Sequence, residues 1–170
     1  VDTTQARRVS DLALALFDHA IPDADAETRR ELGWACALHE IGQMVSHHDH
    51  HRHSAYLLAH VDAPGFSQSQ QRRLGELVLG QRGGLRKIEP QLASETFAWQ
   101  VLCLRLAVIK CHARRVVDPR AIGLRVRHRE ALLSYRGAWA AANPRTGFLL
   151  QEEAATWARS GPLRLVLPVD

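Results

Sequence analysis

The chain has 170 residues, 46% of them apolar, with 22 Lys and Arg against 18 Asp and Glu and a net charge of +4 at neutral pH. This length and apolar content are enough to bury a hydrophobic core, so we expect a folded domain. Arg105 interrupts the most apolar region, residues 101–109, and no stretch reaches the roughly 18 apolar residues of a membrane span. We therefore expect a soluble protein without a membrane partner.

The first residues and the cysteines indicate where the protein is found. Val1 is not an initiator methionine, so we expect the chain to be an excerpt, and no secretory signal pattern follows it. The three cysteines, Cys36, Cys103 and Cys111, form no Cys-x-x-Cys pair, which argues against a disulfide framework and against a zinc ribbon. A reducing cytoplasm is the expected compartment.

Apolar periodicity predicts a mainly helical protein. Spacings of three and four predict helices over residues 4–20, 26–45, 53–61, 68–79 and 92–116. The helix at 68–79 has a capping-box start, because Ser67 precedes Gln70 by three residues. The segment at 92–116 has the broadest apolar face and is predicted to be the spine of the core.

The pattern changes after Pro119. Apolar and polar residues alternate over residues 122–127 and again over 163–167, which predicts two or three short strands. A turn is predicted at Asn143 and Pro144, and a last helix over residues 148–159 is predicted to stop at Gly161. The expected fold is mainly α, a bundle of five to six helices with a small C-terminal antiparallel β addition.

Basic residues are concentrated between positions 110 and 129, where seven Lys or Arg face only Asp118. Such an excess suits an anionic partner, and it also suits a solvated helix end whose dipole favours cations. Nucleic acid is not an expected partner, because this stretch lacks the interleaved aromatic residues of a single-strand platform and shows no known binding motif.

Six of the ten histidines lie between positions 39 and 53. The spacing alone allows a metal site, but no cysteine lies nearby and Asp49 is the only carboxylate from residue 47 to 53, which disfavours a closed zinc site. The alternative is a polar surface loop whose partly charged imidazoles suit anions. His39 differs from the others because it lies in an apolar context and needs a partner or a cavity.

Several stretches together resemble one known family. They are residues 38–42 (LHEIG), 50–58 (HHRHSAYLL), 62–67 (DAPGFS) and 104–109 (LRLAVI), followed by Trp139, Asn143, Pro144, Leu150, Glu152, Trp157 and Gly161. In order and spacing they resemble the C-terminal helical domain of the bacterial exopolyphosphatase and guanosine pentaphosphate phosphatase family. The resemblance covers nearly the whole chain, and its 51–67 part is specific.

The resemblance implies a fold similar to the histidine-aspartate (HD) phosphohydrolases, with an HD-like helical bundle over residues 1–118 and a small α+β subdomain over 119–170. It also implies a degenerate metal site. Gln5 stands near the place of the first-helix histidine, Glu40 replaces the aspartate of the His-Asp pair, and residues 106–108 offer no carboxylate. His39, Glu40 and His53 would be too few to activate a metal-bound water, so they are only weak metal candidates, and we expect no catalytic residue and no cofactor here.

The resemblance further implies that catalysis, with magnesium, belongs to N-terminal actin-like domains of the same protein, which would be partners of this one. This domain would then bind inorganic polyphosphate and form a homodimer. The candidate polyanion-binding residues are His39, Arg52, His53, Arg82, Arg86 and Lys87. Cations spaced along a groove hold a linear polyanion by releasing its counterions.

Three functional alternatives remain open from the sequence. The first is an accessory domain of an exopolyphosphatase, which releases terminal phosphate from polyphosphate. The second is the same role in a guanosine pentaphosphate phosphatase. The third, an active metal-dependent HD phosphohydrolase, needs more ligands than the sequence supplies.

Overall fold

The structure is a computed structural model that describes residues 3–39, 65–113, 118 and 120–169. The α-helices are α1 (Thr3–Ala20), α2 (Ala26–Leu38), α4 (Gln68–Leu79), α5 (Glu95–Lys110), α6 (Trp139–Ala142) and α7 (Pro144–Ser160), and two 3₁₀ helices are η2 (Arg86–Ile88) and η3 (Gln91–Ala93). The strands are β1 (Ile122–Arg127), β2 (Glu130–Tyr135) and β3 (Arg164–Val166). The predicted class, mainly α with a small C-terminal sheet, is confirmed.

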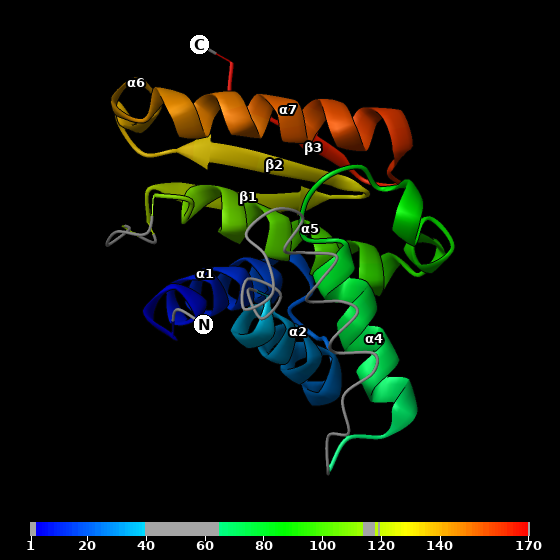
Figure 1. The fold of residues 1–170 in the computed structure, drawn as a ribbon. Coiled ribbons are helices and arrows are strands. Elements are labelled where there is room, and N and C mark those ends of the chain that lie inside the picture. Colours follow the sequence, from blue (N-terminus) through cyan, green and yellow to red (C-terminus); the bar gives the residue numbers. More distant parts are fainter. Residues whose placement is uncertain (1–2, 40–64, 114–117, 119, 170) are drawn as a thin grey trace.

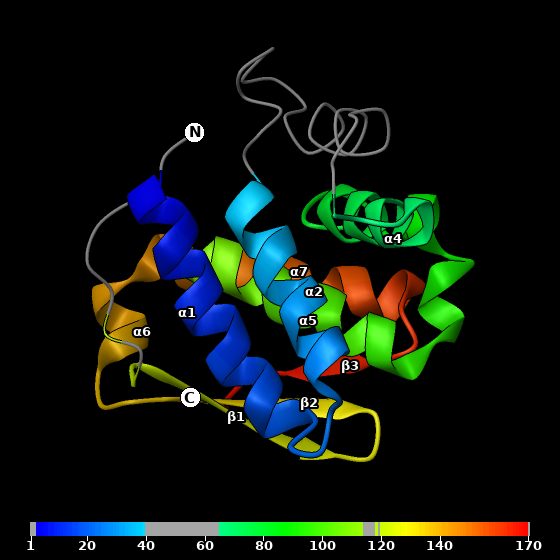
Figure 2. The ribbon, with the colours of Figure 1, turned by 90° about the horizontal axis from the view of Figure 1, so that it is seen from below.

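Helix α5 lies at the centre of the molecule. In Figure 1, α1, α2 and α4 lie on one side of α5, and the sheet with α7 lies on the other. Figure 2 shows α1 and α2 side by side across α5. Every residue of α5 from Phe97 to Ala107 is buried, as expected for a helix that is apolar almost all round. This confirms that the segment forms the spine of the core.

The helix termini follow local signals. Helix α4 begins after Ser67, whose hydroxyl accepts from the Gln70 backbone N–H while the Gln70 side chain accepts from the Ser67 N–H, a complete capping box. The 92–116 helix is shorter than predicted in the described residues, because η3 occupies residues 91–93 and Ser94 caps α5. Helix α7 begins at Pro144, where a turn was predicted, since proline is favoured in the first helical turn.

The sheet has the order β1-β2-β3. Strands β1 and β2 form an antiparallel hairpin, which agrees with the predicted antiparallel pairing although no strand was predicted at residues 130–135, but β3 pairs with β2 in parallel. The difference arises because α6 and α7 connect β2 to β3, so the chain crosses back before β3 begins. The C-terminal addition is therefore a mixed sheet.

One hydrophobic cluster runs through the molecule. It joins Phe17 of α1, Leu32 of α2, Leu77 of α4, Leu133 of β2 and Trp157 of α7, among others. The division at residue 118 stays a prediction, and the packing is continuous across it. Within the described residues, no helix is long and apolar enough to cross a membrane. The predicted helix at 53–61 lies outside the described residues.

Candidate functional site: a basic groove between α5 and α7

A buried ion pair forms the floor of the site. Arg105 of α5 and Glu153 of α7 are 4% and 5% exposed, and two hydrogen bonds join them, from Nε at 2.6 Å and from Nη2 at 2.9 Å. Arg105 also donates to the carbonyls of Gly80 and Gly83, each at 2.9 Å. Arg105 therefore ties α7 to the loop that follows α4.

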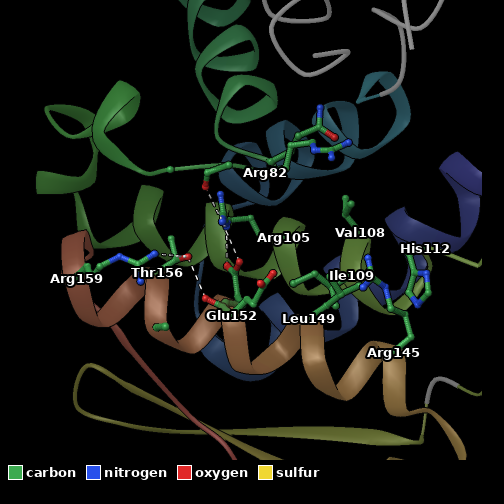
Figure 3. Close-up of a pocket in the computed structure, with 15 residues that line it drawn as sticks. Arg82, Arg105, Val108, Ile109, His112, Arg145, Leu149, Glu152, Thr156 and Arg159 are labelled. Atoms are coloured by element: carbon green, nitrogen blue, oxygen red, sulfur yellow. Dashed lines mark hydrogen bonds and ion pairs between the residues drawn. The ribbon is translucent and has the colours of Figure 1, made fainter. Parts of the chain in front are cut away.

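A groove of about 680 Å³ opens above this ion pair. Residues 81–84 form one wall, the C-terminal half of α5 forms another, and α7 forms the third (Figure 3). Val108, Ile109 and Leu149 give the groove an apolar side. Because Glu153 neutralises Arg105, the electrostatic character of the groove is set by the side chains around its rim.

Besides the paired Arg105, four basic side chains line the groove: Arg82, His112, Arg145 and Arg159. Figure 3 shows His112 and Arg145 at one end, Arg159 at the other end, and Arg82 on the facing wall. His112 Nε2 lies 3.0 Å from the hydroxyl of Thr146. In the part of the chain that the structure describes, no carboxylate pairs with Arg145 or Arg159. Their charges are thus available to an anionic ligand.

Helix geometry explains why α7 supplies both ends. Positions 145, 149, 152, 156 and 159 recur at spacings of three and four, so they lie on one face of the helix. Arg145 and Arg159 are fourteen residues apart, which corresponds to about 21 Å along the axis. Arg145 also lies over the ring of Phe148, 5.9 Å from its centroid. The groove is therefore elongated, with a cation near each end.

The structure places the sequence-predicted residues in different environments. Arg82 is exposed and lines the groove. His39 is 1% exposed, its Nδ1 hydrogen-bonds to the Cys36 carbonyl, and its own carbonyl accepts from Gln81, a groove residue. His39 thus contacts the site through its backbone, and its role in binding stays a prediction.

Two further predicted residues, Arg86 and Lys87, lie among the described residues but outside the groove lining. Arg86 and Lys87 belong to η2, and the Lys87 ammonium donates to the Arg82 carbonyl at 2.6 Å, beside the groove wall. Arg52, His53 and Glu40 lie outside the described residues. Their proposed contacts with a polyanion or a metal stay predictions.

The described residues also bear on the metal and thiol candidates. Among the described residues, no three His, Cys, Asp or Glu side chains are grouped to hold a metal ion. Gln5, which was expected near the place of a first-helix histidine, donates to the Cys111 carbonyl at 2.7 Å. The three cysteines are free and buried, and burial raises the pKa of the Cys36 and Cys103 thiols, so both stay protonated at neutral pH.

Sequence reasoning missed His112, Arg145 and Arg159. Helix periodicity in residues 144–160 would have placed Arg145 and Arg159 on one face, but a helix start at residue 148 excluded Arg145. His112 has no local signal, because it reaches the groove only through the packing of α5 on α7.

Comparisons with known proteins agree on one family. The model of the family described as Ppx/GppA phosphatase, domain III, matches residues 1–154. The chain is 33% identical over 158 residues to a guanosine-5'-triphosphate,3'-diphosphate pyrophosphatase of Photobacterium profundum, an alignment covering 91% of this chain and 32% of that protein. Proteins of the same name from Vibrio cholerae (34% identity; 91% of this chain, 32% of the relative) and Pseudoalteromonas translucida (30%; 95% and 34%) are also similar. The chain spans about a third of the length of these curated relatives.

Proposed function

Because the chain belongs to the Ppx/GppA phosphatase family, as its domain III, we propose that it is the accessory domain of a phosphatase and that its basic groove holds the phosphate groups of the substrate. One observation carries the proposal. Arg145 and Arg159 point into the same groove without a carboxylate partner among the described residues, and Arg82 faces them.

Guanidinium groups suit this role. Each presents planar N–H donors that match phosphate oxygens, and such charge-assisted hydrogen bonds are stronger than neutral ones. Cations spread over an elongated groove hold successive phosphates without needing a single deep pocket. Catalysis, with magnesium, would belong to other domains of the longer protein, so we expect this chain alone to bind the substrate without hydrolysing it.

Two substrates fit this proposal. Inorganic polyphosphate is a linear, negatively charged chain, which the positively charged groove would attract. Guanosine-5'-triphosphate,3'-diphosphate is favoured by the names of the similar proteins. Both are phosphoanhydrides, so the groove would use the same arginines for either. An active metal-dependent phosphohydrolase is a weaker candidate, because the sequence has Gln5 and Glu40 where the resembling fold would supply a histidine and an aspartate as metal ligands.

The test replaces the groove arginines singly. Arg145→Gln and Arg159→Gln should each weaken polyphosphate binding about tenfold or more at low salt, since a hydrogen bond to a charged group contributes about 1.5–3 kcal/mol. The slope of log affinity against log salt concentration should also become shallower. The expected change is about 0.7 for each phosphate that the variant no longer neutralises, which is the value for single-stranded nucleic acid. Calorimetric titration of the purified chain at several salt concentrations measures both quantities.

Arg7→Gln is the matched control, because Arg7 is exposed on α1 and does not line the groove. It removes the same charge and should leave the affinity within about twofold of wild type. If both groove variants bind polyphosphate as tightly as the Arg7 variant, the groove does not hold phosphate.

A further inference from the structure

The basic groove contains an acidic residue halfway between its two end arginines. Glu152 lies seven residues from Arg145 and seven from Arg159 on the same face of α7, about 10 Å from each along the helix axis. Its side chain is exposed in the groove, and the Thr156 hydroxyl donates to its backbone carbonyl at 3.0 Å, which leaves the carboxylate oxygens uninvolved in that bond. None of the ion pairs among the described residues includes Glu152.

Gln81, a residue of the groove wall, carries a second acceptor. Gln81 is 1% exposed, and its amide nitrogen donates to the His39 carbonyl at 2.8 Å. This bond fixes the orientation of the amide, because a carbonyl can only accept and the nitrogen must face it. The amide oxygen is then left buried without a hydrogen-bond partner among the residues that the structure describes. Buried acceptors normally have a donor, so this one suits a ligand that brings an N–H or O–H group.

These two acceptors disfavour a continuous phosphate chain. A linear polyphosphate that reached from Arg145 to Arg159 would place negative phosphates against the Glu152 carboxylate, and like charges at close range repel. A ligand that has phosphates at both ends and a hydrogen-bond-donating body between them avoids the repulsion. The apolar side chains of Val108, Ile109 and Leu149 line the groove and would contact that body.

We propose that Glu152 is a specificity-determining residue, which selects a nucleoside with phosphate groups on both sides of the sugar over bare polyphosphate. The base N–H groups or the sugar hydroxyl donate to Glu152 and Gln81, and the phosphates bind the arginines at the two ends. The inference rests on the proposed function, since it assigns selectivity to the same groove. Glu152 would reject polyphosphate by repulsion, a selectivity that the arginines alone do not supply.

The test compares two ligands on one variant. Glu152→Gln removes the charge and keeps the shape of the side chain. At low salt it should raise the affinity for long-chain polyphosphate about fivefold. The affinity for guanosine-5'-triphosphate,3'-diphosphate should stay unchanged or fall, because a neutral amide oxygen is a weaker acceptor. Calorimetric titration of the purified 170-residue chain with each ligand gives the ratio.

Glu95→Gln is the control, because Glu95 is exposed at the start of α5 and lies outside the groove. Any effect on affinity that comes from the change in net charge alone should appear in both variants. If Glu152→Gln changes both affinities by the same factor as Glu95→Gln, the inference is wrong. The proposed function then still stands if Arg145→Gln weakens binding. The proposed function is also wrong only if the arginine variants bind polyphosphate as tightly as the wild type.

Discussion

Replacing Arg105 with methionine is expected to lower the free energy of unfolding by about 3–5 kcal/mol, because the substitution leaves Glu153 as a buried carboxylate without its cation. The Gly80 and Gly83 carbonyls would lose their donors at the same time. Urea denaturation followed by circular dichroism measures the change. The midpoint should fall without a large change in slope, as expected when stability changes but the surface exposed on unfolding does not.

An exposed pair of the same geometry provides the control. Arg29 also binds a carboxylate through two hydrogen bonds, to Asp18, but both side chains are 49% exposed. Arg29→Met should therefore cost no more than about 1 kcal/mol. The double variant Arg105→Met with Glu153→Leu should recover part of the loss, because it removes the isolated charge. If the Arg105 and Arg29 variants unfold at the same urea concentration, the buried pair does not support the groove.

Truncating Trp157 to alanine should destabilise the protein by about 3–5 kcal/mol, because its indole is fully buried between α7 and the rest of the core. The indole N–H also donates to Glu153 at 2.6 Å. Trp157→Phe loses this donor but keeps much of the apolar volume, so it should cost less than the alanine variant but still about 1.5–3 kcal/mol. Thermal and urea unfolding measure both variants.

Phe148→Ala is the comparison within the same helix. Phe148 is 49% exposed, and its removal should change the stability by about 0.5 kcal/mol or less. If Trp157→Phe were as stable as the wild type, the indole N–H would contribute nothing to holding the Glu153 carboxylate. Contacts other than the indole N–H would then hold Glu153 in position to bind Arg105.

Local signals predicted the helical part of the fold well. The capping box at Ser67 and Gln70 predicted the start of α4, and the apolar run on residues 97–107 predicted a central helix. The β1–β2 hairpin had a weaker signal, because its two-residue connection contains His128 at φ 56° and Arg129 in place of the glycine or asparagine typical of such turns. The parallel pairing of β3 depends on the crossover through α7, which periodicity does not reveal.

The site was harder to predict than the fold. Arg82 was named from its place in a basic cluster, but the groove exists because Arg105 binds Glu153, 48 residues further along the chain. The position of Arg105 inside an apolar helix indicated that a partner carboxylate existed. It did not indicate which carboxylate was the partner. The predicted homodimer, the polyphosphate contacts of Arg52 and His53 and the cytoplasmic location stay predictions.

The position of bound phosphate can be measured directly from the arginine side-chain N–H signals in ¹H–¹⁵N NMR spectra of the purified chain, titrated with long-chain polyphosphate and with guanosine-5'-triphosphate,3'-diphosphate. If the groove holds phosphate, the signals of Arg82, Arg145 and Arg159 shift with either ligand, and that of Arg7 on α1 does not. Shifts that leave Arg145 and Arg159 unchanged while other arginines respond would contradict the assignment of the groove as the phosphate-binding site.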